Sequence, residues 1–537
     1  MAIIELKNIR KTYGPTNVLD NVSWQLDMGD KVALVGANGS GKTTLLRIIS
    51  GDLAADSGFV RIGTDIQIGY VPQEADLDGS KTLREEVYDP ELANIRQNLN
   101  ILEEEMAQDR VDEQKVLKAL DSYNGLKAEF INRDGYGYEA RLGTILSRMG
   151  FYDLDSTVSS LSGGQKSKAQ LAKILIRQPD LLLLDEPDSH LDICALEWLE
   201  DSLCNYKGTV LIVSHDRSLL EKVTDKTVEI ENGRIRQYNG NYSYYADQKE
   251  RMRVRQHYDY VNQQFEIAHL RDAIETLRKW SSKSSNPKHG RRVKSMENRL
   301  EHIEVLDKPR RKPKMQLRFE FQKRSGEIVI EAVSLSKSFG ERTLFANANF
   351  QIRWGEHIGV IGPNGSGKTT LIRIILGLEQ PTSGQVNLGS SLAISYFDQE
   401  QRGLNADKNI YEELEEGTNL TKNETMYLLS RILFTGNKAL KKIDQLSGGE
   451  KNRVMLSKLV YTKANLLILD EPTNHLDIPS IEVLEEALIE FKGTVIAVSH
   501  DRHLLSNFAS RIIELDNGKL RSHYGSYDDA FAQVQDN

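Results

Sequence analysis

The sequence has little cysteine and no long apolar run. Its two cysteines, Cys194 and Cys204, are too few for a disulfide framework, an iron–sulfur cluster or a cysteine-based zinc site, so we expect free thiols in the core. The run from Leu181 to Leu184 ends at Asp185, far short of the roughly 18–20 residues that cross a bilayer. The amino terminus lacks the charged-then-apolar layout of a signal peptide, which predicts a cytoplasmic protein.

The 537 residues contain two copies of one domain. GANGSGKTT begins at Gly36 and GPNGSGKTT at Gly362, an offset of 326 residues. LSGGQ begins at Leu161 and LSGGE at Leu446, an offset of 285 residues. The register holds without a gap within each block, so the change of offset locates an insertion in the first copy, between Gln73 and Leu161.

We place this insertion at about residues 81–140 and expect a helical arm. Leu99, Leu102 and Met106 recur at helical spacing, with charged residues between them. The segment has 14 Asp/Glu against 8 Lys/Arg, which predicts an acidic surface hairpin. Two roles remain open: packing on its own domain, or binding a basic protein partner.

Residues 241–325 belong to neither copy and are basic, although the whole chain has a net charge of −9. They hold 21 Lys/Arg and 11 Asp/Glu. Between Tyr245 and Trp280 there is no proline or glycine and apolar residues recur at helical spacing, which predicts a long helix.

Turn-forming residues at about 281–290 end this helix. A second helix then returns through Val293 and Leu300. From Thr276 to Met296 there are seven Lys/Arg and no acidic residue. The linker is therefore predicted to be a helical hairpin with a cationic tip.

Each copy has a GxxxxGK(S/T) loop between a predicted strand and a predicted helix, the context in which this motif binds phosphates. The glycines let the backbone wrap the phosphates, and the helix amino terminus adds its dipole. Lys42 and Lys368 are expected to neutralise the β- and γ-phosphates. The expected loop residues are Gly36, Ala37, Asn38, Gly39, Ser40, Gly41, Lys42, Thr43, Thr44, Gly362, Pro363, Asn364, Gly365, Ser366, Gly367, Lys368, Thr369 and Thr370.

Buried strands in both copies end in two carboxylates, in LLLLDEP and LLILDEP. Asp185 and Asp470 are expected to support Mg²⁺, together with the hydroxyls of Thr43 and Thr369. The residue that follows each aspartate, Glu186 or Glu471, is expected to polarise the attacking water.

The strands TVLIVSHD and TVIAVSHD each end in a histidine. They bring His215 and His500 to the same edge of their sheets as the acidic pairs. We expect both histidines to sense the γ-phosphate.

LSGGQ and LSGGE each precede an amphipathic helix, for which Ser162 and Ser447 are expected to be amino-terminal caps. The start of such a helix is another anion site. The expected nucleotide-binding residues of these segments are Ser162, Gly163, Gly164, Gln165, Ser447, Gly448, Gly449 and Glu450.

Together these motifs resemble those of ATP-binding-cassette (ABC) ATPases. The resemblance implies an α/β fold of two tandem P-loop ATPase domains, residues 1–240 and 326–537, joined by the helical hairpin. It also implies that the halves close head to tail over two ATP molecules, so that Ser447 completes the site of Lys42 and Ser162 that of Lys368.

Four further residues match family positions. Tyr13 and Phe339 resemble the aromatic residue that stacks on adenine. Gln73 and Gln399 resemble the glutamine that lies near Mg²⁺. Both sites keep the lysine, glutamate and histidine, so both are expected to hydrolyse ATP.

Two cassettes without a membrane segment, DEPTNHLD in the second copy, the arm and the charged linker resemble the ABC-F family. That resemblance implies a monomer that binds the ribosome when ATP closes it. The linker then reaches peptidyl-tRNA and the peptidyl-transferase centre, and the arm meets the large subunit, with a ribosomal protein as its partner. The expected RNA contacts are Lys283, Lys288, Arg291, Arg292 and Lys294.

Three points stay open. Housekeeping translation factors and antibiotic-protection factors both occur in this family. The energy subunit of an importer is the alternative function, although such a subunit has no use for the basic linker. The first copy reads DEPDSHLD, with Asp188 and Ser189 where the second has Thr and Asn. We therefore expect the two sites to differ in rate, without predicting which is slower.

Overall fold

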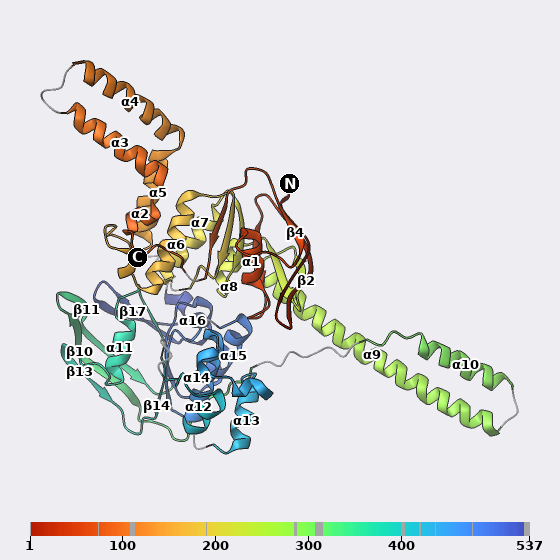
Figure 1. Ribbon diagram of the computed structural model, residues 1–537. Coiled ribbons are helices and arrows are strands. Elements are labelled where there is room, and N and C mark those ends of the chain that lie inside the picture. The colour runs from red at the N-terminus through yellow and green to blue at the C-terminus, as the bar shows by residue number, and fades with distance from the viewer. Residues whose placement is uncertain are drawn as a thin grey trace. The chain divides into compact units, whose positions relative to one another are not determined.

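The computed structural model (Figure 1) describes residues 2–73, 75–107, 113–189, 191–283, 287–306, 315–398, 403–417, 420–434, 436–474 and 476–530. The side chains of residues 113–116, 280–283, 287–290, 417 and 437 lie outside this description. The chain forms two compact units: Met1–Asn241 with Lys314–Asn537, and Tyr242–Pro313. The first unit contains both repeated domains, called cassette 1 and cassette 2 below.

The main sheet of cassette 1 has six strands in the order β5-β6-β7-β3-β8-β9. Neighbouring strands are parallel except β8 and β9, which are antiparallel. Helices cover both faces of such a sheet, so its central strands are continuous apolar runs rather than alternating ones. The strands are β3 (Lys31–Val35), β5 (Ile68–Val71), β6 (Leu181–Asp185), β7 (Thr209–Val213), β8 (Lys226–Glu231) and β9 (Arg234–Tyr238).

A second, antiparallel sheet in the order β2-β1-β4 lies against this layer. Side chains of this sheet, of α1 and of the main sheet form one core, which includes Ile4, Leu45 and Leu183. The remaining elements of cassette 1 are β1 (Ala2–Tyr13), β2 (Thr16–Asp27), β4 (Ser57–Ile62), α1 (Lys42–Ser50), η1 (Val158–Ser160), α6 (Gly163–Arg177), α7 (Ile193–Cys204) and α8 (Arg217–Val223).

Cassette 2 repeats this design with the strand orders β14-β15-β16-β12-β17-β18 and β11-β10-β13. Its strands are β10 (Ile328–Phe339), β11 (Arg342–Arg353), β12 (His357–Ile361), β13 (Ser383–Leu388), β14 (Ile394–Phe397), β15 (Leu466–Asp470), β16 (Thr494–Val498), β17 (Arg511–Asp516) and β18 (Lys519–Tyr524). Its helices are α11 (Lys368–Ile375), α12 (Ile410–Gly417), α13 (Lys422–Arg431), η2 (Gly436–Leu440), η3 (Ile443–Gln445), α14 (Gly448–Thr462), α15 (Ile478–Glu490) and α16 (Arg502–Phe508). The tandem P-loop fold is thus confirmed.

Between β5 and η1, cassette 1 has α2 (Leu83–Val87), α3 (Pro90–Met106), α4 (Glu113–Asn132) and α5 (Gly135–Arg148). The two offsets match α2 with α12 and α5 with α13 of cassette 2, so the inserted elements are α3 and α4. Helices α3 and α4 pack on each other as the hairpin drawn in orange in Figure 1. Proline at the first position of α3 and the side chain of Asp89, which accepts from Glu91 and Leu92 N–H groups, fix where that helix begins.

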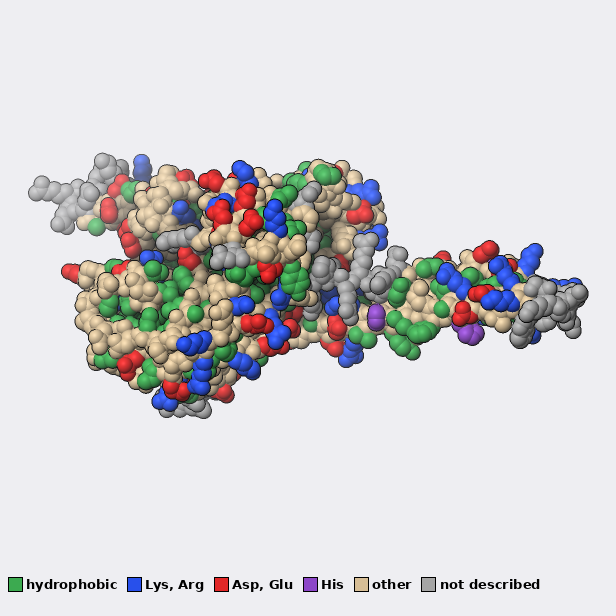
Figure 2. Space-filling view, turned by 90° about the horizontal axis from the view of Figure 1, so that it is seen from below, with side chains coloured by type: hydrophobic (Ala, Val, Ile, Leu, Met, Phe, Trp, Pro, Cys, Tyr) green, Lys and Arg blue, Asp and Glu red, His purple; other side chains and the backbone are tan. Residues whose placement is uncertain are grey.

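The second unit is a hairpin of α9 (Tyr242–Lys283) and α10 (Pro287–Glu301), which we call the linker hairpin. At 1.5 Å per residue, α9 is about 63 Å long. Ile267, Ile274 and Val293 are buried between the two helices. Figure 2 shows basic side chains along its visible face, towards the end of the hairpin that borders the grey residues.

Two expected boundaries were wrong. The predicted tip of about 281–290 is too wide, since α9 continues to Lys283 and α10 already starts at Pro287, because proline is well suited to the first turn of a helix. The predicted end of the linker at 325 is too late. Met315 and Phe319 lie in the core of cassette 2, because every second residue from 315 is apolar and packs on that domain.

The prediction that both cysteines are core thiols also fails in part. Both are free, as expected, but Cys194 is exposed on α7, while Cys204 is half-buried. Within the described residues, none of the helices combines the length and apolarity that a membrane span requires.

Candidate active sites

The two phosphate-binding loops have matching geometry. Each connects a central strand to a helix, β3 to α1 and β12 to α11. The residue before each helix, Gly41 or Gly367, has a φ of 104°. A Cβ atom there would lie 2.7 Å from the Val18 side chain, or 3.1 Å from that of Leu344. Both the backbone conformation and the space therefore require glycine.

The lysine of each loop folds back over it. Lys42 Nζ donates to the carbonyl oxygens of Gly36 at 2.8 Å and Ala37 at 3.4 Å. In cassette 2, Lys368 Nζ donates to Gly362 at 2.7 Å. Burial lowers the pKa of both lysines, and the acidic residues nearby counteract this effect. A desolvated ammonium group held inside a loop suits an anionic ligand with several charges.

The two aspartates at the strand ends fit a metal cation. Asp185 is 1% exposed and Asp470 0%. Within the described part of the chain, neither carboxylate has a hydrogen-bond partner for its oxygens. Burial raises the pKa of each to about 6. Ionising a buried carboxylate without hydrogen-bond partners is energetically costly. A bound Mg²⁺ would offset this cost, because it prefers oxygen ligands and stabilises the ionised form.

The glutamate after each aspartate has a strained backbone. The φ angles of Glu186 and Glu471 are 52° and 51°, in the left-handed region that side chains other than glycine rarely adopt. The N–H of each donates to the last residue of the neighbouring strand, Val213 at 2.8 Å and Val498 at 2.9 Å. A left-handed conformation of this kind costs about 1–3 kcal/mol and is typical of functional sites.

Each glutamate lies next to the predicted histidine. His215 Nε2 is 3.3 Å from Glu186 Oε1, and His500 Nε2 is 3.3 Å from Glu471 Oε1. In cassette 1, Gln73 Nε2 also donates to Glu186 Oε2 at 2.8 Å. The structure thus brings together Glu186, expected to polarise the attacking water, His215, expected to sense the γ-phosphate, and Gln73, expected near Mg²⁺.

Burial raises the pKa of Glu471 to about 8 and lowers that of His500 to about 3. Both shifts favour the uncharged form of the side chain. The pKa of a carboxyl group falls when a cation binds next to it. The protonation state of Glu471 therefore depends on what else occupies the site.

The predicted caps are confirmed. The Ser162 hydroxyl accepts from Gln165 N–H at 3.3 Å, and the Ser447 hydroxyl accepts from Glu450 N–H at 3.2 Å. The side chains of Gln165 and Glu450 in turn accept from the backbone N–H of the serines, which completes a capping box at each helix start.

Two aspartates that the sequence did not single out connect the cassettes. Asn364 N–H in the second loop donates to Asp192 Oδ2 of cassette 1 at 3.0 Å. Reciprocally, Asn38 N–H in the first loop donates to Asp477 Oδ2 of cassette 2 at 3.5 Å. Each phosphate-binding loop therefore meets the other cassette. The repeat offset of 285 pairs Asp192 with Asp477 and was the available signal.

Other predicted residues are placed but not brought into contact with these groups. Tyr13 and Phe339 end β1 and β10 with 52% and 53% of their surface exposed, as a stacking role would require. Gln399 lies outside the described residues.

The cassettes differ at the position after the DEP motif. Thr473 Oγ1 of cassette 2 lies 3.5 Å from Ser499 Oγ. In cassette 1 this position is Asp188, whose buried Oδ1 atom has no hydrogen-bond partner among the described residues. Burial is the main cause that raises the pKa of Asp188. The Ser214 hydroxyl lowers this pKa, and the negative charge of Glu186 raises it further.

The comparisons with known proteins agree with this geometry. A family model described as "ABC transporter" matches residues 19–189 and 345–474, and a second with the same description matches 228–319. The chain is 37% identical over 538 residues to ABC transporter F family member 5 of Arabidopsis thaliana, covering 98% of this chain and 76% of the relative. This chain belongs to the ABC-F family.

A bacterial relative is similar over nearly its whole length. The chain is 34% identical over 520 residues to the energy-dependent translational throttle protein EttA of Escherichia coli, covering 95% of this ABC-F chain and 92% of the relative. The solved structure of an RNase-L Inhibitor has a TM-score of 0.62 at 19% identity and covers 99% of this chain and 92% of that chain. The structural likeness shows the shared tandem fold alone. As an ABC-F protein with two cassettes, the chain binds ATP and is an ATPase.

Proposed function

We propose that the chain hydrolyses ATP at two composite sites. In each, the glycine-rich loop and its lysine hold the phosphates, and Glu186 or Glu471 takes the proton of the attacking water. His215 and His500 orient that carboxylate and meet the γ-phosphate. The observation that carries these roles is the paired left-handed turn, which places both glutamates beside their histidines.

The cation site proposed for each half consists of Asp185 with Thr43 and Gln73, or of Asp470 with Thr369 and Gln399. When bound, Mg²⁺ would neutralise charge that develops on the phosphate oxygens. The opposite cassette would complete each site through Ser447 or Ser162, as the contacts of the loops with Asp477 and Asp192 support.

We further propose that the ATP-bound form binds the ribosome and that the linker hairpin acts on peptidyl-tRNA near the peptidyl-transferase centre. The similarity to a translational throttle protein over 92% of its length supports a role in translation. Charge supports RNA as the ligand: Arg291, Arg292 and Lys294 are exposed at the start of α10. The side chains of Lys283 and Lys288 lie outside the described residues, and their RNA contacts remain predictions.

Electrostatics would make this binding sensitive to salt. The Debye length is about 8 Å at physiological ionic strength, so each cation of the hairpin interacts mainly with charges within about that distance. If about five cations meet phosphates, the logarithm of affinity should fall with the logarithm of salt with a slope near −4.

Only residues 284–286 separate α9 from α10. In the ABC-F family a long interhelical segment tends to accompany antibiotic resistance, so we favour a translation factor over a ribosome-protection factor. The acidic arm is proposed to bind a basic ribosomal protein, since α3 and α4 expose Ile101, Leu117 and Leu120 among their charged residues.

The test is co-sedimentation with ribosomes. The double variant Glu186→Gln/Glu471→Gln should bind ATP without hydrolysing it and should be enriched with ribosomes in a gradient when ATP is present. Removing three charges from the tip, with Arg291→Gln, Arg292→Gln and Lys294→Gln in that background, should abolish the enrichment.

The matched control removes three exposed charges from the other end of α9, with Arg251→Gln, Arg253→Gln and Arg255→Gln. It should retain most of the binding. Equal loss in both triple variants would reject the tip as the contact. ATP-dependent capture by a membrane permease without any enrichment on ribosomes would favour the importer alternative.

A further inference from the structure

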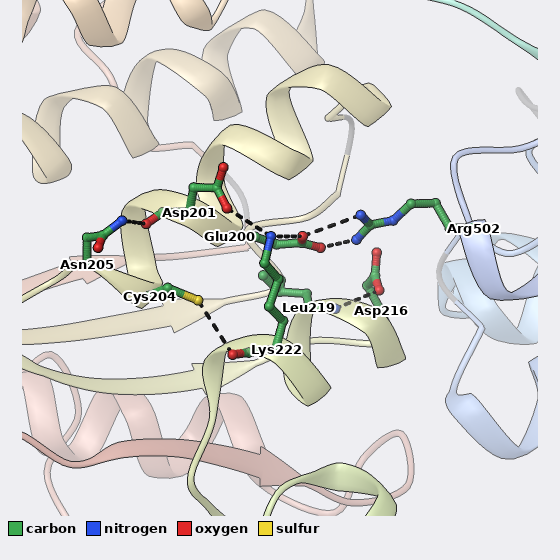
Figure 3. A network of polar contacts seen from close by, with 8 residues as sticks. All are labelled: Glu200, Asp201, Cys204, Asn205, Asp216, Leu219, Lys222 and Arg502. Atoms are coloured by element: carbon green, nitrogen blue, oxygen red, sulfur yellow. Dashed lines mark hydrogen bonds and ion pairs between the residues drawn. The ribbon is translucent and has the colours of Figure 1, made fainter. Parts of the chain in front are cut away.

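Two equivalent ion pairs join the cassettes away from the phosphate-binding loops. Arg217 Nη2 of cassette 1 lies 2.8 Å from Glu485 Oε2 of cassette 2. Arg502 of cassette 2 donates through both terminal nitrogens to Glu200 of cassette 1, with Nη1 at 3.3 Å from Oε2 (Figure 3). The repeat offset of 285 relates Arg217 to Arg502 and Glu200 to Glu485.

These are buried pairs rather than surface pairs. Glu200 is 2% exposed and Glu485 10%, and their arginines are no more than 15% exposed. Each glutamate is also held by its own cassette at equivalent positions, Glu200 by Lys222 at 3.3 Å and Glu485 by Asn507. Each buried glutamate thus has one partner in its own cassette and one in the other. Loss of either partner would leave a buried carboxylate incompletely paired, which is strongly destabilising.

Cassette 1 contacts helix α15 of cassette 2 at two points. Asp477, the cap of α15, accepts from Asn38 N–H in the first phosphate-binding loop. About two turns later, Glu485 binds Arg217. Helix α15 follows Glu471 in the chain, so it connects the candidate base of the second site to two parts of the first.

Helix α7 of cassette 1 has the reciprocal arrangement. Its cap Asp192 accepts from Asn364 N–H of the second loop, and Glu200 binds Arg502. Helix α7 follows Glu186. Moreover, Arg502 stands two residues after His500, as Arg217 stands two residues after His215, so each arginine lies close along the chain to the histidine of its own site.

We propose that Arg217, Glu485, Arg502 and Glu200 are positioning residues that couple the two ATP sites in opposite directions. A change at His500 is transmitted through Arg502 to Glu200 and shifts α7. Because α7 follows Glu186 in the chain, this shift changes the position of the Glu186 carboxylate in the other site. A change at His215 reaches Glu471 through Arg217, Glu485 and α15. This inference rests on the proposed roles of the two glutamates and histidines.

The test measures one site at a time. In the Glu471→Gln background, where the first site supplies the turnover, Arg502→Gln should lower kcat by about fivefold or more, with a smaller change in KM for ATP. Arg217→Gln should change that kcat less than twofold, although it lies beside His215. In the Glu186→Gln background the order should reverse.

A merely local role predicts the opposite pattern, with each arginine affecting its own site. That pattern, or equal losses in both backgrounds, would overturn the coupling. Arg502→Lys keeps the charge and should restore at least half of the lost turnover. Glu200→Gln should reproduce Arg502→Gln, and the double variant should add little to either, since both remove one interaction.

A readout without hydrolysis separates this inference from the proposed catalytic roles. If the Glu186→Gln/Glu471→Gln variant still hydrolyses ATP at the wild-type rate, those roles fail. Coupling is then judged by cooperative binding of a non-hydrolysable ATP analogue. The Hill coefficient should exceed 1 in the wild type and fall to 1 in Arg217→Gln/Arg502→Gln. An unchanged Hill coefficient would overturn the coupling.

Discussion

Glu186 and Glu471 lie 285 residues apart, yet their backbones share a left-handed conformation, with φ angles of 52° and 51°. Both carboxylates also lie 3.3 Å from the Nε2 atom of the matching histidine. The two halves thus keep the same energetically costly turn at the same place. Because this strain persists in both, it is best explained by the need to aim a carboxylate.

The strain itself can be measured at Glu471. Glu471→Gly and Glu471→Ala both remove the buried carboxylate, but only glycine adopts a positive φ without cost. We expect the glycine variant to be more stable than the alanine variant by about 1 kcal/mol. Chemical denaturation of both variants checks this. Equal stability would mean that the turn relaxes when the side chain is lost.

Removing the candidate bases should stop hydrolysis while preserving nucleotide binding. A general base contributes about 10²–10⁴-fold in rate, so the Glu186→Gln/Glu471→Gln variant should lose at least about 100-fold in kcat. Each single variant should retain the turnover of its intact site. Phosphate release and binding of a fluorescent ATP analogue are the two measurements. Weakened binding in parallel with the rate would argue for a structural role instead.

Asp188 should slow the first site. It places an additional carboxyl group beside Glu186, where the equivalent position in cassette 2 is Thr473. In the Glu471→Gln background, Asp188→Thr is expected to raise turnover by up to about tenfold, the effect of roughly one pKa unit. The reciprocal change, Thr473→Asp in the Glu186→Gln background, is expected to lower turnover at the second site. If neither substitution alters the rate, the asymmetry of the motif has no kinetic consequence.

Stability should depend on pH through Asp216, which caps α8. Burial first, and then the charges of Asp501 and Asp188, raise the pKa of Asp216 to about 7. An unfolded aspartate has a pKa near 3.9, so between about pH 4 and 7 the folded protein holds a proton that the unfolded chain has lost. The free energy of unfolding therefore falls as pH rises through this window and levels off above it.

Asp216→Asn removes this titration and keeps a good helix cap. From pH 5 to pH 8, the wild type should lose about 2–3 kcal/mol relative to this variant. Thermal unfolding of both proteins at the two pH values gives the comparison. A constant difference would show that Asp216 is ionised at both pH values.

The sequence was sufficient for groups that lie close together along the chain. These groups belong to local motifs: the phosphate-binding loops, the two DEP carboxylates, the histidines and the serine caps. Each motif occurs in both copies of the domain, which strengthened its prediction. Gly41 shows why this works, since its left-handed φ is determined by its immediate neighbours.

Contacts between the cassettes could not be predicted in this way. Arg502 and Glu200 are 302 residues apart, and their ion pair exists only because two complete domains dock on each other. The boundary after the linker failed for a different reason. Met315 and Phe319 alternate with polar residues, which is a strand-like pattern. The prediction nevertheless assigned them to the linker, because the surrounding segment is basic.

The reciprocal contacts of Asn38 with Asp477 and of Asn364 with Asp192 have a consequence for divergence. We therefore expect a substitution at either contact to affect the phosphate-binding loop of the other cassette as well as its own half. The two halves of the chain are thus expected to be constrained together. A replacement such as that at Asp188 must be tolerated by the pair as a whole, not only by the half that carries it.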